Sequence, residues 1–281
     1  MKNSTKIWLI AATVLLTVGL AMLAAVILKY NWNFDKLSTK KYETNSYNIN
    51  DEFNNISINT NDADITFALA KDGNCKVECY EETKAKHSVE VREDTLFVNV
   101  CNEKSWYDYI GIYFKSAKIT VYLPKNEYSS FDIKGKTSDV CIENIGMESL
   151  NISVSTGDVT VSDIICGGDV TVGVSTGDIC MTNIASKNVL SRGSTGDILL
   201  KNVIASGKIS VKRSTGDIKF SDSDASEIFA QTNTGDVTGS LLSEKVFITQ
   251  SDTGTIKVPK STKGGKCEIN TDTGDIKIEI K

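Results

Sequence analysis

Proline and histidine are nearly missing from this 281-residue chain, which has two prolines and one histidine, His87. With so little proline and only 20 glycines, the composition excludes collagen-like and low-complexity disordered chains. The single histidine lies in the strand-like stretch KHSVEV, where we expect a surface position, and it leaves no Ser/His/Asp set to assemble elsewhere. The sequence therefore predicts a protein that is not an enzyme and has no catalytic residues.

An excess of basic residues is missing too, since the formal net charge is −5 and the pI is about 5.1. We expect no nucleic-acid partner, because such proteins need a basic face. The seven cysteines have neither regular spacing nor a metal-like pairing, which argues against a disulfide framework. Cys75 and Cys79 are four residues apart in a strand-like stretch, so we interpret them as buried or half-buried thiols.

The chain does contain an uncharged apolar run at 7–28, IWLIAATVLLTVGLAMLAAVIL. A helix of this length crosses the roughly 30 Å of hydrocarbon in a bilayer, and the aromatic and basic residues that come after it are typical of a membrane interface. We expect a short tail at 1–6, a transmembrane helix at 7–28 that contacts the lipid bilayer, and a polar stalk at 29–50. The count of Lys and Arg slightly favours a cytoplasmic C-terminal side, but long domains translocate regardless of this count, so the orientation stays open.

Alternation of apolar and polar residues marks the next part, 51–130. The stretches FNNISINTNDADITF, CKVECYE, HSVEVRE, TLFVNVC and AKITVYLP fit half-buried antiparallel strands, and the aromatic stretch WYDYIGIYF lies among them. We interpret 51–130 as a β-rich lead-in, the N-terminal part of the repeat domain.

A repeat occupies 131–281. The hexapeptide VSTGDV at 154–159 returns as VSTGDI, GSTGDI and RSTGDI, and more loosely as TNTGDV, SDTGTI and TDTGDI, at steps of 19 or 20 residues. Apolar residues alternate with polar ones on both sides of each turn, as a strand needs in order to bury one face. A copy this short cannot bury its apolar side chains alone, so we expect eight stacked coils, including a degraded first turn at Thr137. The predicted fold class is all-β: a β-solenoid, or parallel β-helix-like stack of 19–20-residue coils, with a strand-rich N-terminal lead-in and one N-terminal transmembrane helix.

Each turn repeats a glycine and, with one exception, an aspartate. The glycines are expected to supply a backbone geometry that tolerates no Cβ, often with positive φ; they are Gly157, Gly177, Gly196, Gly216, Gly235, Gly254 and Gly274. The aspartates are expected to accept hydrogen bonds from the backbone amides of their own turn.

Metal binding is the alternative interpretation of the aspartates, because stacked carboxylates about 5 Å apart repel one another unless a cation lies between them. A calcium ladder would use Asp158, Asp178, Asp197, Asp217, Asp236 and Asp275. Each coil offers about one carboxylate, however, while calcium takes six to eight oxygens, and Thr255 interrupts the row. We therefore expect no metal and no cofactor, with calcium as the alternative.

A polar stripe is predicted three residues before the turn threonines, at Arg192, Lys212, Gln231 and Gln250. These side chains should face outward, either as a solvated face or as a contact surface for glycans or anionic polymers. Some parallel β-helices cleave acidic polysaccharides, but they do so with long loops inserted between coils, and coils of 19 or 20 residues leave no room for such loops.

The N-terminal apolar segment, the ITVYLP-type strand and the tandem STGDV and STGDI turns together resemble the bacterial "putative adhesin" β-strand-repeat family, a membrane-anchored domain of unknown function. The resemblance covers residues 50–281. It implies a β-solenoid held at the bacterial cell envelope. The family has no established catalytic residues, so none is carried over to this chain.

These observations predict a single-pass membrane protein that displays its repeat domain outside the cytoplasmic membrane and acts in adhesion, or in interaction with an envelope polymer or protein. Envelope-stress sensing through a membrane partner is one alternative, and a scaffold that forms homo-oligomers through the solenoid edges is another. The last coil, DIKIEIK, is expected to leave an uncovered edge at the end of the chain, guarded against pairing by Lys257, Lys277, Glu279 and Lys281.

Overall fold

The computed structural model of the protein describes residues 3–32, 40–102, 116–125 and 127–281, so the aromatic stretch at 106–114 lies outside the described residues. The chain divides into two units. The first holds helix α1 (Asn3–Lys29), and the second, called the repeat unit below, holds Glu43–Asn102 and Ser116–Lys281. Helix α1 contains the whole apolar run at 7–28. Among the described residues, one helix is long and apolar enough to cross a membrane, a property that signal sequences share.

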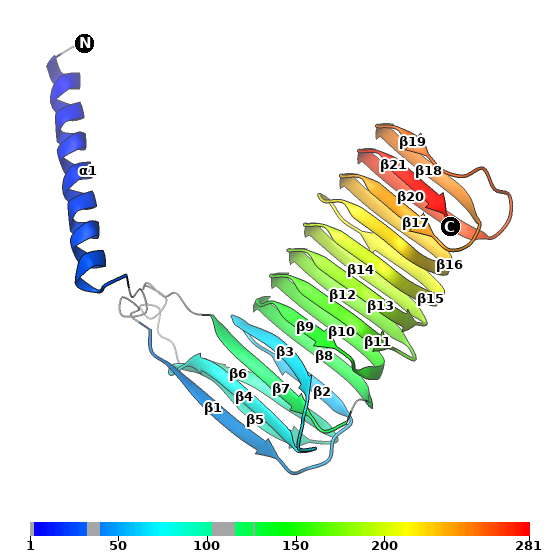
Figure 1. Ribbon diagram of the computed structural model, residues 1–281, viewed down its shortest axis with the longest axis horizontal. Coiled ribbons are helices and arrows are strands. Elements are labelled where there is room, and N and C mark those ends of the chain that lie inside the picture. Colours follow the sequence, from blue (N-terminus) through cyan, green and yellow to red (C-terminus); the bar gives the residue numbers. More distant parts are fainter. Residues whose placement is uncertain (1–2, 33–39, 103–115, 126) are drawn as a thin grey trace. The chain divides into compact units, whose positions relative to one another are not determined.

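The repeat unit is a β-solenoid, as predicted, in which the chain winds between two facing parallel sheets (Figure 1). Each coil gives one strand to each sheet, so a strand pairs with the strand two places along the chain rather than with the next one. The strands of the regular part are β8 (Glu127–Thr137), β9 (Val140–Glu143), β10 (Gly146–Thr156), β11 (Val159–Ile165), β12 (Asp169–Thr176), β13 (Ile179–Ser186), β14 (Asn188–Thr195), β15 (Ile198–Lys212) and β16 (Ile218–Thr234). β15 and β16 run through a corner and pair in both sheets.

The register keeps equivalent apolar residues of successive coils in line. Leu150 lies beside Val170, which lies beside Val189, and the opposite sheet repeats this with Val159, Ile179 and Ile198. All six are at most 1% exposed, and burying one such side chain is worth about 1.5–3 kcal/mol. The stability of the fold therefore comes from contacts between stacked coils. A register shift of one residue would turn these apolar side chains outward.

The lead-in extends the same two sheets and is not a separate layer. β2 (Asn55–Asn59) lies between β6 (Thr95–Asn102) and β8, and β3 (Ala63–Leu69) lies between β7 (Ala117–Leu123) and β9, all in parallel. Antiparallel pairing was predicted for this whole part. Among its described residues it occurs where β4 (Cys75–Glu82) meets β7 and where β5 (Ala85–Arg92) meets β6, whereas β2 and β3 pair in parallel.

The segment interpreted as a polar stalk, 29–50, is shorter than expected, because β1 (Tyr42–Ile49) is a strand that pairs with β4. Among the described residues β1 pairs with β4 alone, and apart from Ile49 its half-buried side chains carry polar groups: Tyr42, Glu43, Asn45 and Tyr47. Asn45 donates to Glu81 Oε1 at 2.8 Å, and the Tyr47 hydroxyl donates to the His87 carbonyl at 3.1 Å. A strand that buries polar groups gives no apolar alternation, and so its sequence is indistinguishable from that of a stalk.

The last two coils are stacked in an order that differs from their order in the sequence. They consist of β18 (Lys245–Thr253) with β19 (Ile256–Lys257), and of β20 (Gly265–Thr273) with β21 (Ile276–Ile280). β20 lies between β16 and β18, and β21 lies between β17 (Val237–Leu241) and β19 (Figure 1). The final residues of the chain thus form an inner coil, and β18 and β19 form the outermost one.

The expectation that DIKIEIK leaves the uncovered edge is therefore wrong. Lys277, Glu279 and Lys281 lie in or next to the inner strand β21, and of the four expected guards only Lys257 belongs to the outermost coil. The chain returns through 258–264, where Gly264 adopts a φ of +90° against the Glu244 carbonyl. Sequence order alone cannot reveal such a return, because the spacing between the turns stays at 19 or 20 residues.

Candidate functional site

The TGD turns stack on one corner of the solenoid. Two features of these turns require glycine: the backbone conformation and the close approach of the neighbouring coil. The seven glycines have φ between +120° and +157°, a region that L side chains rarely adopt. A Cβ built on Gly177 would also lie 2.0 Å from the carbonyl oxygen of Gly157 in the adjacent coil. The glycines therefore let neighbouring coils approach at the spacing of a parallel sheet, and their role is architectural.

The turn aspartates form a continuous hydrogen-bond ladder between coils. The Oδ1 atom of each aspartate accepts the backbone N–H of its counterpart in the next coil, as in Asp178 N to Asp158 Oδ1 at 2.8 Å and Asp197 N to Asp178 Oδ1 at 2.7 Å. The expectation of bonds within the same turn is thus wrong, because the close approach of coils brings the neighbour's amide nearer. The full series runs through Asp64, Asp139, Asp158, Asp178, Asp197, Asp217, Asp236 and Asp275 to Thr255.

Thr255 marks the end of this ladder. Its N–H donates to Asp275 Oδ1 at 2.7 Å, and Asp275 N–H donates to Asp236 across 39 residues of sequence. Because the coil of Thr255 is the outermost one, no further amide needs a carboxylate there. Thr255, which interrupts the row of aspartates in the sequence, is therefore the last residue of the ladder in the structure.

The predicted polar stripe forms a column on the outside of one sheet. Arg192 lies beside Lys212, and Lys212 lies beside Gln231. Asn270 of the inner coil then separates Gln231 from Gln250, which lies on the outermost coil. Arg192, Lys212 and Gln250 are exposed, and the Lys212 ammonium lies 4.8 Å from the centre of the Phe229 ring. The column gives two adjacent cations on a flat, rigid face.

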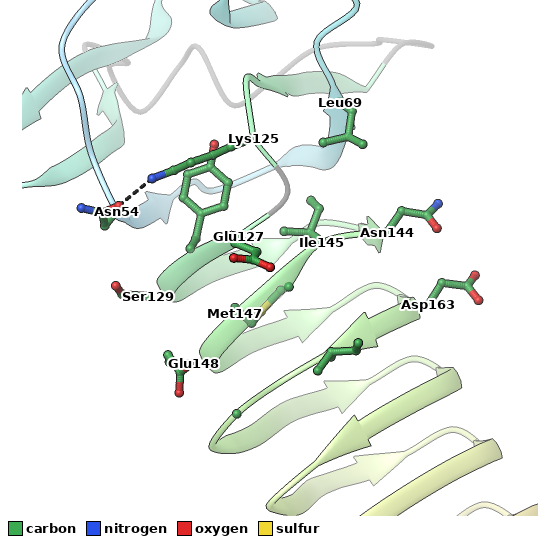
Figure 2. A pocket seen from close by; sticks show the side chains of 14 residues that line it. Asn54, Leu69, Lys125, Glu127, Ser129, Asn144, Ile145, Met147, Glu148 and Asp163 are labelled. Carbon is green, nitrogen blue, oxygen red and sulfur yellow. Dashed lines mark hydrogen bonds between the residues drawn. The ribbon is translucent and has the colours of Figure 1, made fainter. Parts of the chain in front are cut away.

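An open groove of about 810 Å³ lies where the lead-in meets the first regular coils (Figure 2). Lys125 Nζ donates to Asn54 Oδ1 at 2.6 Å and lies 5.0 Å from the centre of the Tyr128 ring. The rest of the lining combines carboxylates with apolar side chains and comprises Leu69, Glu127, Ser129, Asn144, Ile145, Gly146, Met147, Glu148, Asp163, Ile165 and Gly167. A mixed surface of this kind suits contact with a polymer or a protein, and its lining residues include no histidine to activate a nucleophile.

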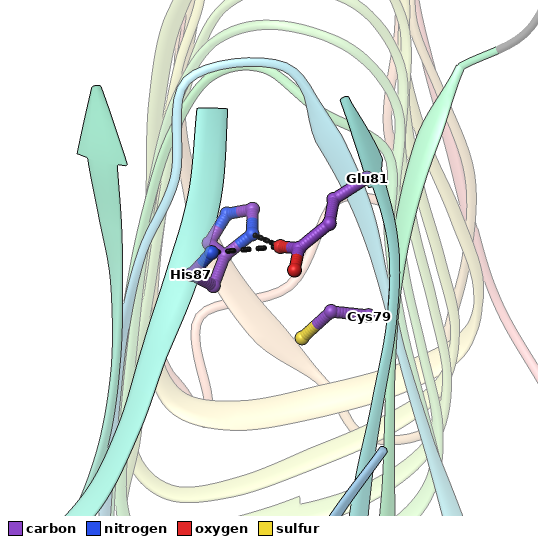
Figure 3. Close-up of side chains that lie close together, drawn as sticks. All are labelled: Cys79, Glu81 and His87. Carbon is purple, nitrogen blue, oxygen red and sulfur yellow. Dashed lines mark hydrogen bonds and ion pairs between the residues drawn. The ribbon is translucent and has the colours of Figure 1, made fainter. Parts of the chain in front are cut away.

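His87 is buried, contrary to the expectation of a surface position, with 3% of its surface exposed (Figure 3). The alternation of β5 turns it inward together with Ala85. Its Nδ1 lies 2.6 Å from Glu81 Oε2, which also accepts the His87 backbone N–H at 2.7 Å, and its Nε2 lies 2.9 Å from the Thr60 hydroxyl. Since β4 and β5 belong to opposite sheets, this pair links the two sheets at the end of the stack that begins the repeat unit.

This cluster has the residue types of a reactive site but is arranged as a structural link. Thr60, His87 and Glu81 form a hydroxyl–imidazole–carboxylate series, yet Thr60 is only 2% exposed, so a substrate does not reach it. Ligand atoms of Cys79, Glu81 and His87 also lie within 4.8 Å of one another, and all three residue types can bind zinc. Both imidazole nitrogens and both carboxylate oxygens have hydrogen-bond partners within the cluster and its neighbours, and burial raises the pKa of Cys79 to about 12.

Two structural features escaped the sequence interpretation. Arg213, just before a TGD turn, points into the core with 3% exposure, where it follows the valines at 154 and 174 in the same column. The second corner of five successive coils uses a residue with φ between +51° and +57°, at Asn144, Asp163, Asn183, Asn202 and Asp222. An Asn or Asp five residues after Asp139, Asp158, Asp178, Asp197 and Asp217 was the available signal, because these residues tolerate the left-handed conformation best after glycine.

Comparisons with known proteins agree on the fold. A family model described as Toastrack DUF4097 matches residues 53–248 and 167–281. A "putative adhesin" from Bacteroides fragilis has a crystal structure similar to this one, with a TM-score of 0.55 and 22% identity over 86% of this chain and 98% of the other. A "putative adhesin" from Parabacteroides distasonis has a TM-score of 0.50 and 12% identity over 85% and 98% of the two chains. No curated protein matches the chain.

Proposed function

Because the chain belongs to the Toastrack DUF4097 family, we propose that it is a membrane-anchored, non-enzymatic β-solenoid displayed at the bacterial cell envelope, where it acts in adhesion or interaction. The family expected from the sequence is the one found. The structures similar to it carry the name adhesin, and a rigid stack with broad outer faces suits contact with a large partner better than chemistry on a small one.

The observation that carries this proposal is the regularity of the coils. Turns of fixed length leave flat sheets on the outside of the solenoid. The groove is an open surface. The His87 cluster is a buried link whose imidazole nitrogens both have partners. Catalysis needs a reachable reactive group, and the buried histidine does not supply one. Recognition by an extended surface needs only exposed polar and apolar side chains held rigidly, which both sheets provide.

Helix α1 supports the membrane part of the proposal. Its apolar side chains are exposed along its length, and such a surface is stable in lipid. We take it as an uncleaved anchor that holds the repeat unit outside the cytoplasmic membrane. The stripe of Arg192, Lys212, Gln231 and Gln250 is the face that we assign to an envelope polymer or protein partner, with the two cations suited to anionic groups.

Labelling of intact cells tests the placement. Cys101 is exposed, so a membrane-impermeant maleimide should label it in cells that express the full chain. A Cys101→Ser variant should lose this labelling. Labelling that appears only after lysis would place the repeat unit inside and contradict the proposal.

Charge reversal tests the role of the stripe. The double variant Arg192→Glu/Lys212→Glu should reduce attachment of expressing cells to isolated cell-wall polymer. Lys201→Glu/Lys219→Glu makes the same charge change on exposed residues of the other sheet and should leave attachment intact. Equal attachment by all three proteins would remove the stripe from the proposal.

A further inference from the structure

β18 is an open sheet edge at the end of the stack. Among the described residues it forms a ladder with β20 alone, so the backbone groups along its other side are unpaired. Proteins usually protect such an edge with charged residues, proline or a bulge. The six residues 246–251, VFITQS, contain none of these charges, no proline and no glycine. Segments of this composition pair readily with another strand.

Exposed apolar side chains of the repeat unit are concentrated in the same coil. Val246 and Ile248 project outward from β18 with 36% and 51% of their surface exposed, and Leu242 just before β18 and Ile256 in β19 are 44% and 40% exposed. Phe247 lies half-buried at the open end of the core. In the described remainder of the unit, the exposed large hydrophobic residues are Leu69, Ile165 and Ile204. Repeat stacks normally end in a polar capping repeat, whereas this one ends in an apolar strand.

We propose that two copies of the protein pair through β18, edge to edge and antiparallel, about a two-fold axis at Phe247. A two-fold interface needs a surface that complements itself. In this register Val246 faces Ile248 of the other copy, Phe247 faces its own counterpart, and Glu244 faces Gln250. Apolar residues thus meet apolar ones. Moving the axis to Ile248 would instead bring Glu244 against Asp252, where like charges destabilise a cross-strand pair.

The position of this edge sets how the repeat units of the two copies are arranged. β18 lies at one end of the stack, and β1 lies at the other. Pairing through β18 therefore places the two β1 strands at opposite ends of a joined stack. The pairing rests on the fold of the repeat unit alone and does not depend on the proposed display outside the membrane.

Self-association of the full chain in detergent micelles tests the pairing. Light scattering after gel filtration should show a concentration-dependent dimer. Ile248→Lys should weaken the dimer roughly tenfold or more, because each pairing loses the burial of two Ile248 side chains. The matched variant Ile204→Lys changes another exposed isoleucine, 38%, on β15 and should associate like the parent. A parent protein that stays monomeric at about 100 μM, or an equal loss in both variants, would overturn the proposal.

Disulfide trapping tests the register, in a Cys101→Ser/Cys267→Ala background, because Cys267 is the register neighbour of residue 247 in the same molecule. Phe247→Cys should form a covalent dimer on mild oxidation, because a residue on the axis faces its counterpart at cross-strand distance. Gln250→Cys should not, since its counterpart lies several residues away. Trapping through residue 250 but not through 247 would contradict the register.

The Cys101 labelling separates this inference from the proposed display at the envelope. Failure of that labelling in cells would refute the display and leave the dimer in micelles unchanged.

Discussion

Arg213 extends its guanidinium across Gly193 of the neighbouring coil, into the space that a side chain at 193 would fill. The two residues are adjacent in register, and a Cβ built on Gly193 would lie 1.7 Å from Arg213 Nη1. Nη1 and Nη2 instead donate to the carbonyls of Val174, at 2.8 Å, and Gly177, at 3.2 Å, one coil further on. Burial lowers the pKa of Arg213, and the charges of Asp178 and Asp197 oppose this effect. A buried cation is thus tolerated because glycine makes room for it to reach two carbonyls.

A double-mutant cycle tests this relationship. Gly193→Val alone should destabilise the protein by about 3 kcal/mol or more, because the new side chain overlaps the guanidinium and its Cβ would also lie 1.9 Å from the Val174 carbonyl oxygen. Arg213→Val alone should cost less, since it leaves a cavity but also removes a buried charge. The double variant relieves the overlap with the guanidinium but not the close approach to the Val174 carbonyl, so we expect its loss to be smaller than the sum by at least about 1 kcal/mol without a return to the stability of the parent. Additive losses in urea unfolding would contradict the coupling.

The aspartate ladder predicts that substituting an inner aspartate lowers the free energy of unfolding more than substituting Thr255, the last residue of the ladder. Asp217→Ala removes the acceptor of the Asp236 N–H and should lower the free energy of unfolding by about 1–2 kcal/mol. Thr255→Ala should change it by less than about 0.5 kcal/mol, because no further coil lies beyond it. Thermal or urea unfolding of both variants measures the difference, and similar losses would show that Thr255 is not the end of the ladder.

A buried ion pair should make the outermost coil sensitive to acid. Lys245 Nζ lies 2.6 Å from Asp224 Oδ1 and 2.5 Å from Ser243 Oγ, and the Lys245 side chain is 3% exposed. Burial favours a raised pKa for Asp224, but hydrogen bonds from Lys245 and Ser243 outweigh it and leave the pKa lowered. A carboxyl with a lowered folded-state pKa stabilises the fold above its unfolded value of about 3.9, and this contribution disappears as the pH falls through the folded-state pKa.

Asp224→Asn should therefore cost about 2 kcal/mol at pH 7, a value reduced for the partial exposure of Asp224. Measured against the parent, this difference should shrink as the pH falls below about 4. Asp252→Asn, an exposed acid of the same coil, serves as the control with no expected loss. A penalty for Asp224→Asn that persists unchanged in acid would show that the ion pair is not its cause.

Calcium should leave the melting temperature unchanged. Each ladder aspartate already uses one oxygen for the amide of the next coil, so a cation would find about one free oxygen per coil where calcium needs six to eight. A ligand that binds only the folded state raises its stability in proportion to the logarithm of its concentration. Melting curves with millimolar calcium and with chelator should therefore coincide, and a clear upward shift with calcium would restore the metal-ladder alternative.

The coils could be predicted because the repeat encodes them locally. An apolar residue in every second position and a glycine in every turn specify one strand, one corner and one buried face. The order of the last two coils could not be predicted in this way, since every coil offers nearly the same edge to every other. Thr255 was the available signal, because a missing acceptor identifies the coil that has no neighbour beyond it.

The candidate site was less accessible to sequence reasoning. The column of Arg192 and Lys212 results directly from the period of the repeat, which places equivalent residues side by side. The link between His87 and Glu81 joins strands of opposite sheets through an antiparallel end that the repeat does not encode. Arg213 could not be recognised as buried either, because its burial depends on a glycine 20 residues away whose importance appears only when the coils are stacked.

The inner position of β20 and β21 has a consequence for synthesis. A ribosome delivers residues 245–257 before 265–281, yet the earlier segment rests on the later one. Until residues 265–281 have been synthesised, β17 therefore lacks its neighbour β21, and β18 and β19 lack the strands on which they rest. A stop codon just before residue 265 would thus unsettle more than the residues it removes, because it would leave β18 and β19 without the layer beneath them.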